Sequence, residues 1–159
     1  MGKNIYGIKR NGFSLTELMI TLAITGILAA VAYPVYTGFM STGARAAGQA
    51  DLMALAAAME RHRAANFTYA GAASGGGNTG SPAIFATHSP SSEPESKKRY
   101  NLAIDSVATN GISYVISATP VSGTIQEGDG KLFYYSDGRK AWDQNNNGSI
   151  ASTEYCWQC

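Results

Sequence analysis

The order of apolar and polar positions divides the chain into a membrane-length segment, an amphipathic helix and a β-rich remainder. From Phe13 to Gly43 the residues are almost all apolar, and Glu17 is the only acidic or basic side chain among them. About 20 such residues in helical form span a bilayer. Basic residues precede the segment at Lys3, Lys9 and Arg10, a bias that places the N-terminus in the cytoplasm and the chain after about residue 40 outside it.

The apolar pattern continues past Pro34, but from Ala44 to Ala65 charged residues are interleaved with it. Leu52, Leu55 and Met59 recur at helical spacing, which predicts one apolar stripe on an otherwise polar helix. We therefore expect one helix of about fifty residues, broken or bent near Pro34, whose outer half packs on a sheet.

Strand patterns begin only after a region rich in glycine, proline and serine. Residues 70–98 have this composition and are expected to form a surface loop, with Ala83-Ile84-Phe85 as an anchor. Alternating or β-rich runs follow, separated by Asn-Gly and Asp-Gly turn signals, at 100–104, 113–119, 131–136 and 139–142. The expected fold is α+β: a long N-terminal helix on a three- to four-stranded antiparallel sheet.

The presence of Glu17 in this segment suggests a function, because a charge inside a membrane-spanning segment costs roughly 2.5 to 3.5 kcal/mol on insertion scales. A cationic group nearby would keep the carboxylate charged, so we expect Glu17 to select a partner; otherwise it reaches the membrane interface. The apolar segment is about twice as long as that of a secretory signal peptide and lacks a small-residue cleavage site after it. It is therefore expected to be retained.

The stretch Gly12-Phe13-Ser14-Leu15-Thr16-Glu17-Leu18, together with Pro34, resembles the amino-terminal signature of type IV pilins and pseudopilins. Within that group the chain looks most like the type IVa kind and PilE-like minor pilins. The resemblance is strong over residues 8–40 and weaker over the strands from Tyr100 to Asp143.

The resemblance implies that a prepilin peptidase cuts between Gly12 and Phe13 and N-methylates Phe13. It also implies that Glu17 pairs with the terminal amine of a neighbouring subunit and that Pro34 is the helix-kinking proline. Three regions result: a cleaved cytoplasmic leader (1–12), a transmembrane and assembly half of the helix (13–40), and a periplasmic globular domain with the amphipathic half of the helix (41–159).

By the same resemblance, the expected function is that of a minor pilin in filament assembly or twitching motility. The protein would enter the bacterial inner membrane and then pass into an extracellular pilus. Its partners would be other pilin subunits, the prepilin peptidase, the inner-membrane assembly platform and the membrane. A type II secretion pseudopilin shares the N-terminal pattern and remains an alternative, as does a pilus-tip adhesin or DNA-uptake module.

Charge and residue chemistry argue against nucleic acid as a partner and against an enzyme. Without the leader the chain has nine Lys and Arg against eleven Asp and Glu. The basic run Lys97-Lys98-Arg99 has no interleaved aromatic residues and is typical of solvated surface. His62 and His88 have no cysteine or second histidine at ligand spacing, and neither is expected to act as a catalytic base.

Residues 143–154 match the pattern D-x-[DN]-x-[DN]-G-x₅-E at each specified position and resemble a calcium-binding EF-hand loop without its helices. The expected ligands are Asp143, Asn145, Asn147, the carbonyl of Ser149 and Glu154. With two charged ligands, Ca²⁺ would bind weakly and act structurally. The alternative is a plain turn, because Asn- and Gly-rich sequence forms turns without a metal.

Cys156 and Cys159 stand in a Cys-Trp-Gln-Cys arrangement at the C-terminus. Outside the cytoplasm a disulfide is expected. So short a loop would contribute only about 2 kcal/mol, enough to stiffen the tail rather than to stabilise the domain.

Overall fold

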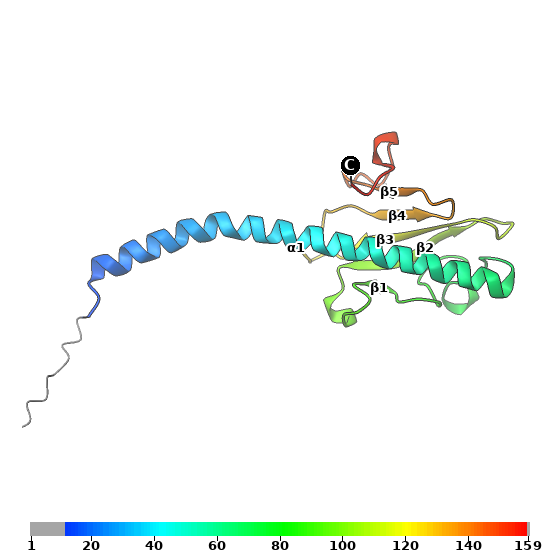
Figure 1. Cartoon of the computed structure of the whole chain (residues 1–159), viewed down its shortest axis with the longest axis horizontal. Coiled ribbons are helices and arrows are strands. Elements are labelled where there is room, and N and C mark those ends of the chain that lie inside the picture. The colour runs from blue at the N-terminus through cyan, green and yellow to red at the C-terminus, as the bar shows by residue number, and fades with distance from the viewer. Residues whose placement is uncertain (1–11, 159) are drawn as a thin grey trace, which may run out of the picture. The chain divides into compact units, whose positions relative to one another are not determined.

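The computed structural model describes residues 12–158, which form two compact units that meet between Thr37 and Gly38. The expected leader residues 1–11 and Cys159 lie outside the described residues. The described residues form one long helix, α1, and five strands, which are labelled in Figure 1. Among the described residues, the first unit contains the start of α1, and the second contains the rest of α1 and the sheet.

Helix α1 runs from Leu15 to Asn66, 52 residues, so the expected helix of about fifty residues is confirmed. Pro34 lies inside it without ending it, so of the two expected alternatives, a break or a bend, the break is excluded. Proline removes one backbone donor, but the helix continues through the residues on both sides of it. The hydroxyl of Thr37 also donates to the Pro34 carbonyl at 3.0 Å.

The sheet has five antiparallel strands in the order β1-β2-β3-β4-β5. They are β1 (His88–Ser89), β2 (Tyr100–Val107), β3 (Tyr114–Pro120), β4 (Leu132–Tyr135) and β5 (Lys140–Trp142). The last four correspond to the predicted strands. The prediction of three or four strands missed β1, because a two-residue strand is too short to show an alternating pattern.

The core of the second unit lies between one face of α1 and the sheet. The predicted stripe Leu52, Leu55 and Met59 is fully buried and packs with Tyr100, Leu102, Ile104, Tyr114, Ile116, Ala118 and Leu132. Gly48 brings the helix close to β2, since a Cβ there would lie 3.2 Å from the Tyr100 ring and 3.4 Å from Leu132.

Although its composition predicts a surface loop, the region before β2 makes contacts with both the core and α1. Ile84 and Phe85 pack against the core, as the predicted anchor required, and Ala72 and Ala73 are buried in it. Asp51 of α1 accepts hydrogen bonds from the hydroxyl of Ser89 at 2.6 Å and from the hydroxyl and backbone N–H of Ser91 at 2.6 and 2.9 Å. This carboxylate holds the end of β1 against the helix.

Candidate functional site

The first turn of α1 holds Glu17 through a reciprocal set of hydrogen bonds with Ser14. The backbone N–H and hydroxyl of Ser14 both donate to Oε2 of Glu17 at 2.8 Å, and the N–H of Glu17 donates to the Ser14 hydroxyl at 3.2 Å. This is a capping box, in which the residue before the helix and the third helical residue satisfy each other's backbone donors. Glu17 therefore starts the helix that carries it.

Ser14 is a residue that the sequence reasoning missed, although Ser-x-x-Glu before an apolar run is a known helix-start signal. Only Oε2 of Glu17 is used by the capping box, and Oε1 accepts no hydrogen bond from the described part of the chain. Phe13, one residue before the cap, is 80% exposed. The carboxylate can thus keep its local role and still accept a donor from outside the chain.

The apolar first unit has no partner within the described chain. Its large side chains, from Phe13 to Tyr36, are all more than half exposed. Helix α1 is also the one helix in the described residues that is long and apolar enough to cross a membrane. An apolar surface of this extent needs lipid or other helices around it.

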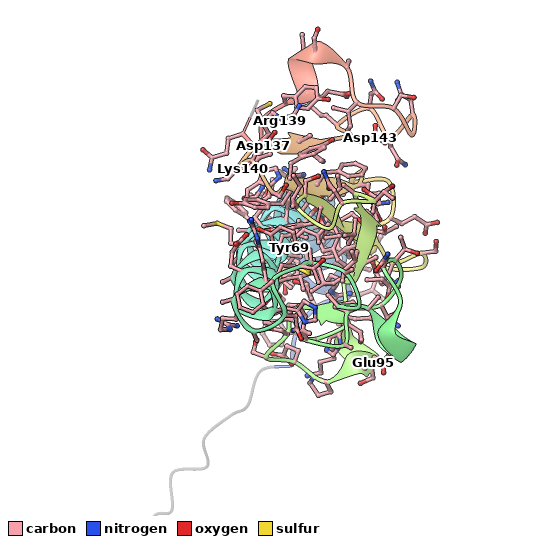
Figure 2. The ribbon with its side chains drawn as sticks, turned by 90° about the vertical axis from the view of Figure 1, so that its right-hand side faces the viewer. Tyr69, Glu95, Asp137, Arg139, Lys140 and Asp143 are labelled. Atoms are coloured by element: carbon pink, nitrogen blue, oxygen red, sulfur yellow. The ribbon has the colours of Figure 1, made fainter. Side chains whose placement is uncertain are left out.

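At the other end of the chain, the loop after β5 is organised around Asp143, whose position Figure 2 shows. Asp143 is only 3% exposed, and its two carboxylate oxygens accept the backbone N–H groups of Asn147 and Gly148 at 3.0 and 2.9 Å. Positive φ angles at Asn146 and Gly148, 51° and 81°, allow the chain to turn this tightly around one side chain.

Glu154 approaches the same loop from its far end. It is 4% exposed, and its Oε1 and Oε2 accept the N–H groups of Asn145 and Ala151 at 3.4 and 2.9 Å. The side-chain oxygens of Asn145 and Asn147 also face inward along the turn, where they accept the N–H groups of Asn147 and Ser149 at 3.0 and 2.8 Å. Ile150, also in this loop, is half-buried.

The oxygens that the sequence predicted as ligands are thus gathered in one loop by backbone hydrogen bonds. Two buried carboxylates approach the loop without a basic side chain bound to either of them in the described structure. A charged carboxylate buried away from water is usually stabilised by an opposite charge or by a metal ion. Among the described residues, no group of three or more His, Cys, Asp or Glu side chains is placed to hold a metal ion, and the other predicted ligands in this loop are amide oxygens and a carbonyl.

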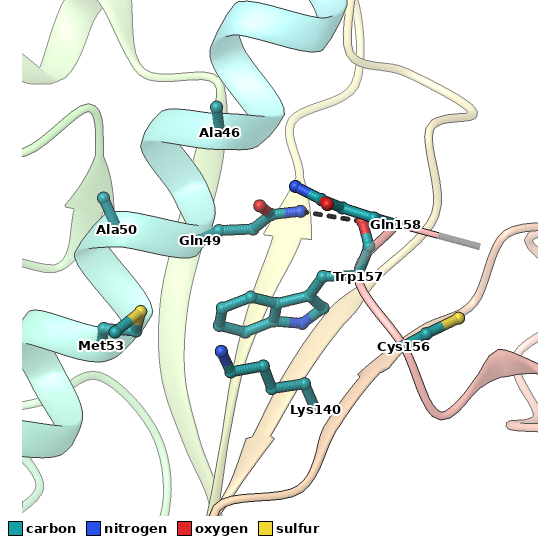
Figure 3. Close-up of a pocket in the computed structure, with 8 residues that line it drawn as sticks. All are labelled: Ala46, Gln49, Ala50, Met53, Lys140, Cys156, Trp157 and Gln158. Carbon is teal, nitrogen blue, oxygen red and sulfur yellow. Dashed lines mark hydrogen bonds between the residues drawn. The ribbon is translucent and has the colours of Figure 1, made fainter.

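The tail after this loop returns to α1 through Trp157, which is 8% exposed. Its indole N–H is 3.2 Å from the carbonyls of both Phe133 and Ala141, and its own carbonyl accepts the side-chain amide of Gln49 at 3.2 Å (Figure 3). The Lys140 ammonium lies 4.8 Å from the centre of the indole ring. Cys156 lies beside Trp157, but its predicted disulfide partner, Cys159, is outside the described residues.

Five of the nine basic side chains of the second unit form ion pairs with acidic ones. Ion pairs join Arg45 to Asp129, Lys97 to Glu93, Lys98 to Glu95, Lys131 to Asp105 and Arg139 to Asp137. In the last pair, the Arg139 backbone N–H and guanidinium lower the pKa of Asp137 below its usual value. More than half of the basic side chains of this unit are therefore paired within the described chain.

Two family models match the chain. The first, described as "Type IV minor pilin ComP, DNA uptake sequence receptor", matches residues 34–130, and the second, "Prokaryotic N-terminal methylation motif", matches residues 8–33. The searches of curated proteins and of solved structures found no significant match. The first match covers most of the sheet and the outer half of α1, and the second covers the junction that contains Gly12, Phe13 and Glu17.

Proposed function

Because the chain belongs to the type IV minor pilin family, we propose that this minor pilin subunit acts in filament assembly or twitching motility. The exposed apolar surface of the first unit carries the proposal, because it has no partner in the described chain and suits first a bilayer and then the helices of other subunits. The membrane is the bacterial inner membrane, with the globular domain on the periplasmic side.

We further propose that prepilin peptidase cuts between Gly12 and Phe13 and methylates the new terminal residue, Phe13. The match to the N-terminal methylation motif supports this, as does the exposed position of Phe13 just before the helix. The terminal amine of one subunit then pairs with Glu17 of its neighbour. The free Oε1 of Glu17 supports such a pairing, since it can accept a charged donor while Oε2 keeps the capping box.

A chromosomal deletion complemented with Glu17→Ala or with wild type tests the role in assembly. We expect the wild-type gene to restore twitching and the protein to be present in sheared pili, measured by mass spectrometry. Glu17→Ala should leave the protein in the membrane and remove it from pili. Ser14→Ala is the matched control: it weakens the helix cap by about 1 kcal/mol but keeps the carboxylate, so it should still enter pili.

The same deletion separates the pilin from a type II secretion pseudopilin. Loss of twitching with intact protein secretion supports the pilin, and loss of secretion with intact twitching supports the pseudopilin. Filaments that remain while adhesion alone is lost would support a tip adhesin.

We also propose that the 143–154 loop binds Ca²⁺ as a structural ion. Asp143, Asn145, Asn147, the Ser149 carbonyl and Glu154 would hold it, and a divalent cation would supply the positive charge that the two buried carboxylates lack. With two charged ligands the affinity should lie in the range of extracellular modules, about 10⁻⁴ to 10⁻³ M. The ion would fix the end of β5 and the Trp157 tail against the sheet.

Calorimetric titration and thermal melting of the full chain in detergent test the calcium proposal. At a dissociation constant near 1 mM, 10 mM Ca²⁺ should stabilise the fold by about 1.4 kcal/mol. Asp143→Asn should abolish both the heat and the stabilisation, whereas Asp137→Asn, in an exposed turn, should leave both unchanged. Absence of heat and of a melting shift at 10 mM Ca²⁺ in wild type would leave the loop a plain turn.

The tail is proposed to carry a Cys156–Cys159 disulfide. Its expected signature is a mass increase of about 2 Da after reduction of the secreted protein, and an unchanged mass would contradict it. Since so short a loop contributes about 2 kcal/mol at most, reduction should lower the melting temperature only slightly.

DNA binding is the second candidate function, because the matching family is described as a DNA uptake sequence receptor. The balanced ion pairs of the second unit weigh against it, since affinity for DNA comes mainly from unpaired cations on phosphates. Gel-shift titration with genomic fragments of the host at 50 and 200 mM salt decides the matter. We expect no shift at 200 mM salt, and a sequence-dependent shift there would establish the receptor role.

A further inference from the structure

A pocket of about 330 Å³ lies in the second unit, beside the part of α1 where the apolar stretch ends. Phe39, Met40, Gly43 and Ala44 of α1 form one side, and Pro90, Glu93, Lys97 and Arg99 form the other. Gly43 and Ala44 leave room at the helix surface, where a Cβ at Gly43 would contact nothing within 4 Å. One side of the pocket is thus apolar and the other carries two cations.

Arg99 is the most informative residue of this pocket. It is half-buried, and its guanidinium has no hydrogen bond or ion pair with any of the residues that the structure describes. A guanidinium offers five N–H donors in a planar fork that suits phosphate. A half-buried arginine without an acceptor therefore points to an anion from outside the chain.

The second cation, Lys97, is only weakly engaged. Its ammonium lies 3.9 Å from a carboxylate oxygen of Glu93, and both side chains are exposed, so the pair contributes little. Lys98, its neighbour, does not line the pocket and instead binds Glu95 at 3.1 Å. The pocket keeps one net positive charge from Lys97, Arg99 and Glu93.

The wall that carries these cations is held in place before any ligand arrives. Asp51 binds Ser89 and Ser91 on either side of Pro90, as described above. The backbone N–H of Arg99 donates to the Ser89 carbonyl at 2.8 Å, and the N–H of Lys97 donates to the Pro94 carbonyl at 2.8 Å. Such preorganisation lowers the cost of binding.

The position of Phe39 and Met40 along α1 indicates which part of the membrane surrounds them. A span of about 20 residues that begins at Leu15 ends near residue 35, so Phe39 and Met40 follow about one turn later, at the depth of lipid headgroups. Phe39 is 75% exposed there. An aromatic side chain with adjacent cations is typical of this interface, where the ring meets acyl chains and the cations meet phosphate.

We propose that this pocket binds the headgroup of an anionic phospholipid, of the phosphatidylglycerol class, in the leaflet that faces the globular domain. Arg99 and Lys97 bind the phosphate, and Phe39 and Met40 contact the first methylenes of an acyl chain. The site would orient the domain on the membrane before the subunit is extracted. This inference rests on membrane anchoring alone, so it can fail without affecting the pilus test, which needs no lipid measurement.

Native mass spectrometry of the full chain in detergent tests the proposal, with phosphatidylglycerol or phosphatidylcholine of identical acyl chains as probes. We expect phosphatidylglycerol to be retained preferentially. Arg99→Gln should lower its occupancy about fivefold and Lys97→Gln to a similar or smaller extent, since one cation at a membrane surface is worth about that factor. Lys98→Gln is the matched control and should bind like wild type.

Lys97 is exposed, so its variant remains informative if Arg99→Gln destabilises the domain, which melting by circular dichroism would reveal. Equal retention of both lipids, or unchanged phosphatidylglycerol occupancy in the Lys97 and Arg99 variants, would overturn the proposal. Displacement of the lipid by millimolar inorganic phosphate would instead indicate a free-anion site, and displacement by a short DNA duplex a nucleic-acid site. Either displacement would also overturn it.

Discussion

Asp129 receives donors from three separate segments. Its carboxylate binds the Arg45 guanidinium of α1 and accepts the Tyr100 hydroxyl at 2.5 Å, and its carbonyl accepts the Trp142 indole N–H at 2.6 Å. The Arg45 guanidinium also stacks 3.9 Å from the centre of the Trp142 ring. Asp129, in the turn before β4, thereby joins α1 and β2 through its carboxylate and β5 through its backbone carbonyl.

Asp129→Asn should destabilise the domain by about 2 kcal/mol, because it removes a charge-assisted pair and leaves the Arg45 cation partly buried without its anion. Thermal or urea unfolding measures the loss. Asp137→Asn breaks an exposed pair with Arg139 and should have no measurable effect. Equal losses of stability in the two variants would show that the partly buried Arg45–Asp129 pair stabilises the domain no more than the exposed pair.

Tyr100 and Tyr114 should make the fold sensitive to alkali. Burial raises the pKa of both hydroxyls well above the ordinary value of about 10, and Asp129 adds to the rise at Tyr100. A raised pKa contributes stability that is complete below about pH 10 and is lost as the pH rises above it. We expect the unfolding free energy to be flat up to about pH 10 and then to fall.

The alkaline decline should be less steep in Tyr100→Phe, which has one fewer raised hydroxyl, although that variant is less stable at neutral pH. Phenylalanine at Tyr135, where the pKa is raised less, should leave the slope nearly unchanged. Identical slopes in wild type and Tyr100→Phe would show that other groups cause the decline.

At the scale of elements, the contact between α1 and β2 depends on a glycine. Helix interiors usually gain about 0.5–1 kcal/mol from glycine to alanine, but a methyl group at position 48 would press on the Tyr100 ring. That ring cannot move aside easily, since it is fully buried and its hydroxyl is bonded to Asp129 and Gln126.

Gly48→Ala should therefore lower the melting temperature, with an overpacking cost of about 1–3 kcal/mol that exceeds the helix gain. Gly43→Ala, at a position with open space around it, should raise the melting temperature slightly. If Gly48→Ala were as stabilising as Gly43→Ala, the close approach of α1 to β2 would be wrong.

Sequence pattern alone predicts four of the five strands but not β1. The last four were readable from β-rich runs and from the Asp-Gly and Asn-Gly turns between them, and alternate side chains of β2 are buried at its start. At one such turn Gly130 has a φ of 84°, and a Cβ there would lie 1.8 Å from the Asp143 carbonyl. Strand β1 was not readable, because its two residues are held by β2 and by Asp51, which are distant in sequence.

At the scale of the whole molecule, the C-terminal tail packs against both the sheet and α1 of the second unit. Trp157 binds strand carbonyls through its indole and α1 through its backbone carbonyl, so the last residues connect the sheet edge with the helix (Figure 3). The 143–154 loop lies directly between β5 and this residue. The stability of the tail and the order of the loop should therefore depend on each other.

Trp157→Ala should destabilise the full chain by about 3–5 kcal/mol, as expected for loss of a buried indole. It should also weaken the response to Ca²⁺, since the loop loses its anchored end. Tyr155→Ala, at a half-exposed position in the same tail, should cost much less. Unfolding with and without Ca²⁺ gives both quantities, and a Trp157→Ala variant as stable as Tyr155→Ala would contradict the account.

The sequence by itself determined the long helix, the apolar membrane-length segment, the strand positions after Tyr100, and the methylation-type junction at Gly12 and Phe13. These follow from local chemistry: runs of apolar residues, helical or alternating periodicity, turn dipeptides, and a motif at fixed spacing. Only the tertiary structure decided that Asp129 joins three segments and that Arg99 lines one pocket with Phe39 and Met40. Such pairings depend on which distant segments the fold brings together, and periodicity along the chain carries no record of them.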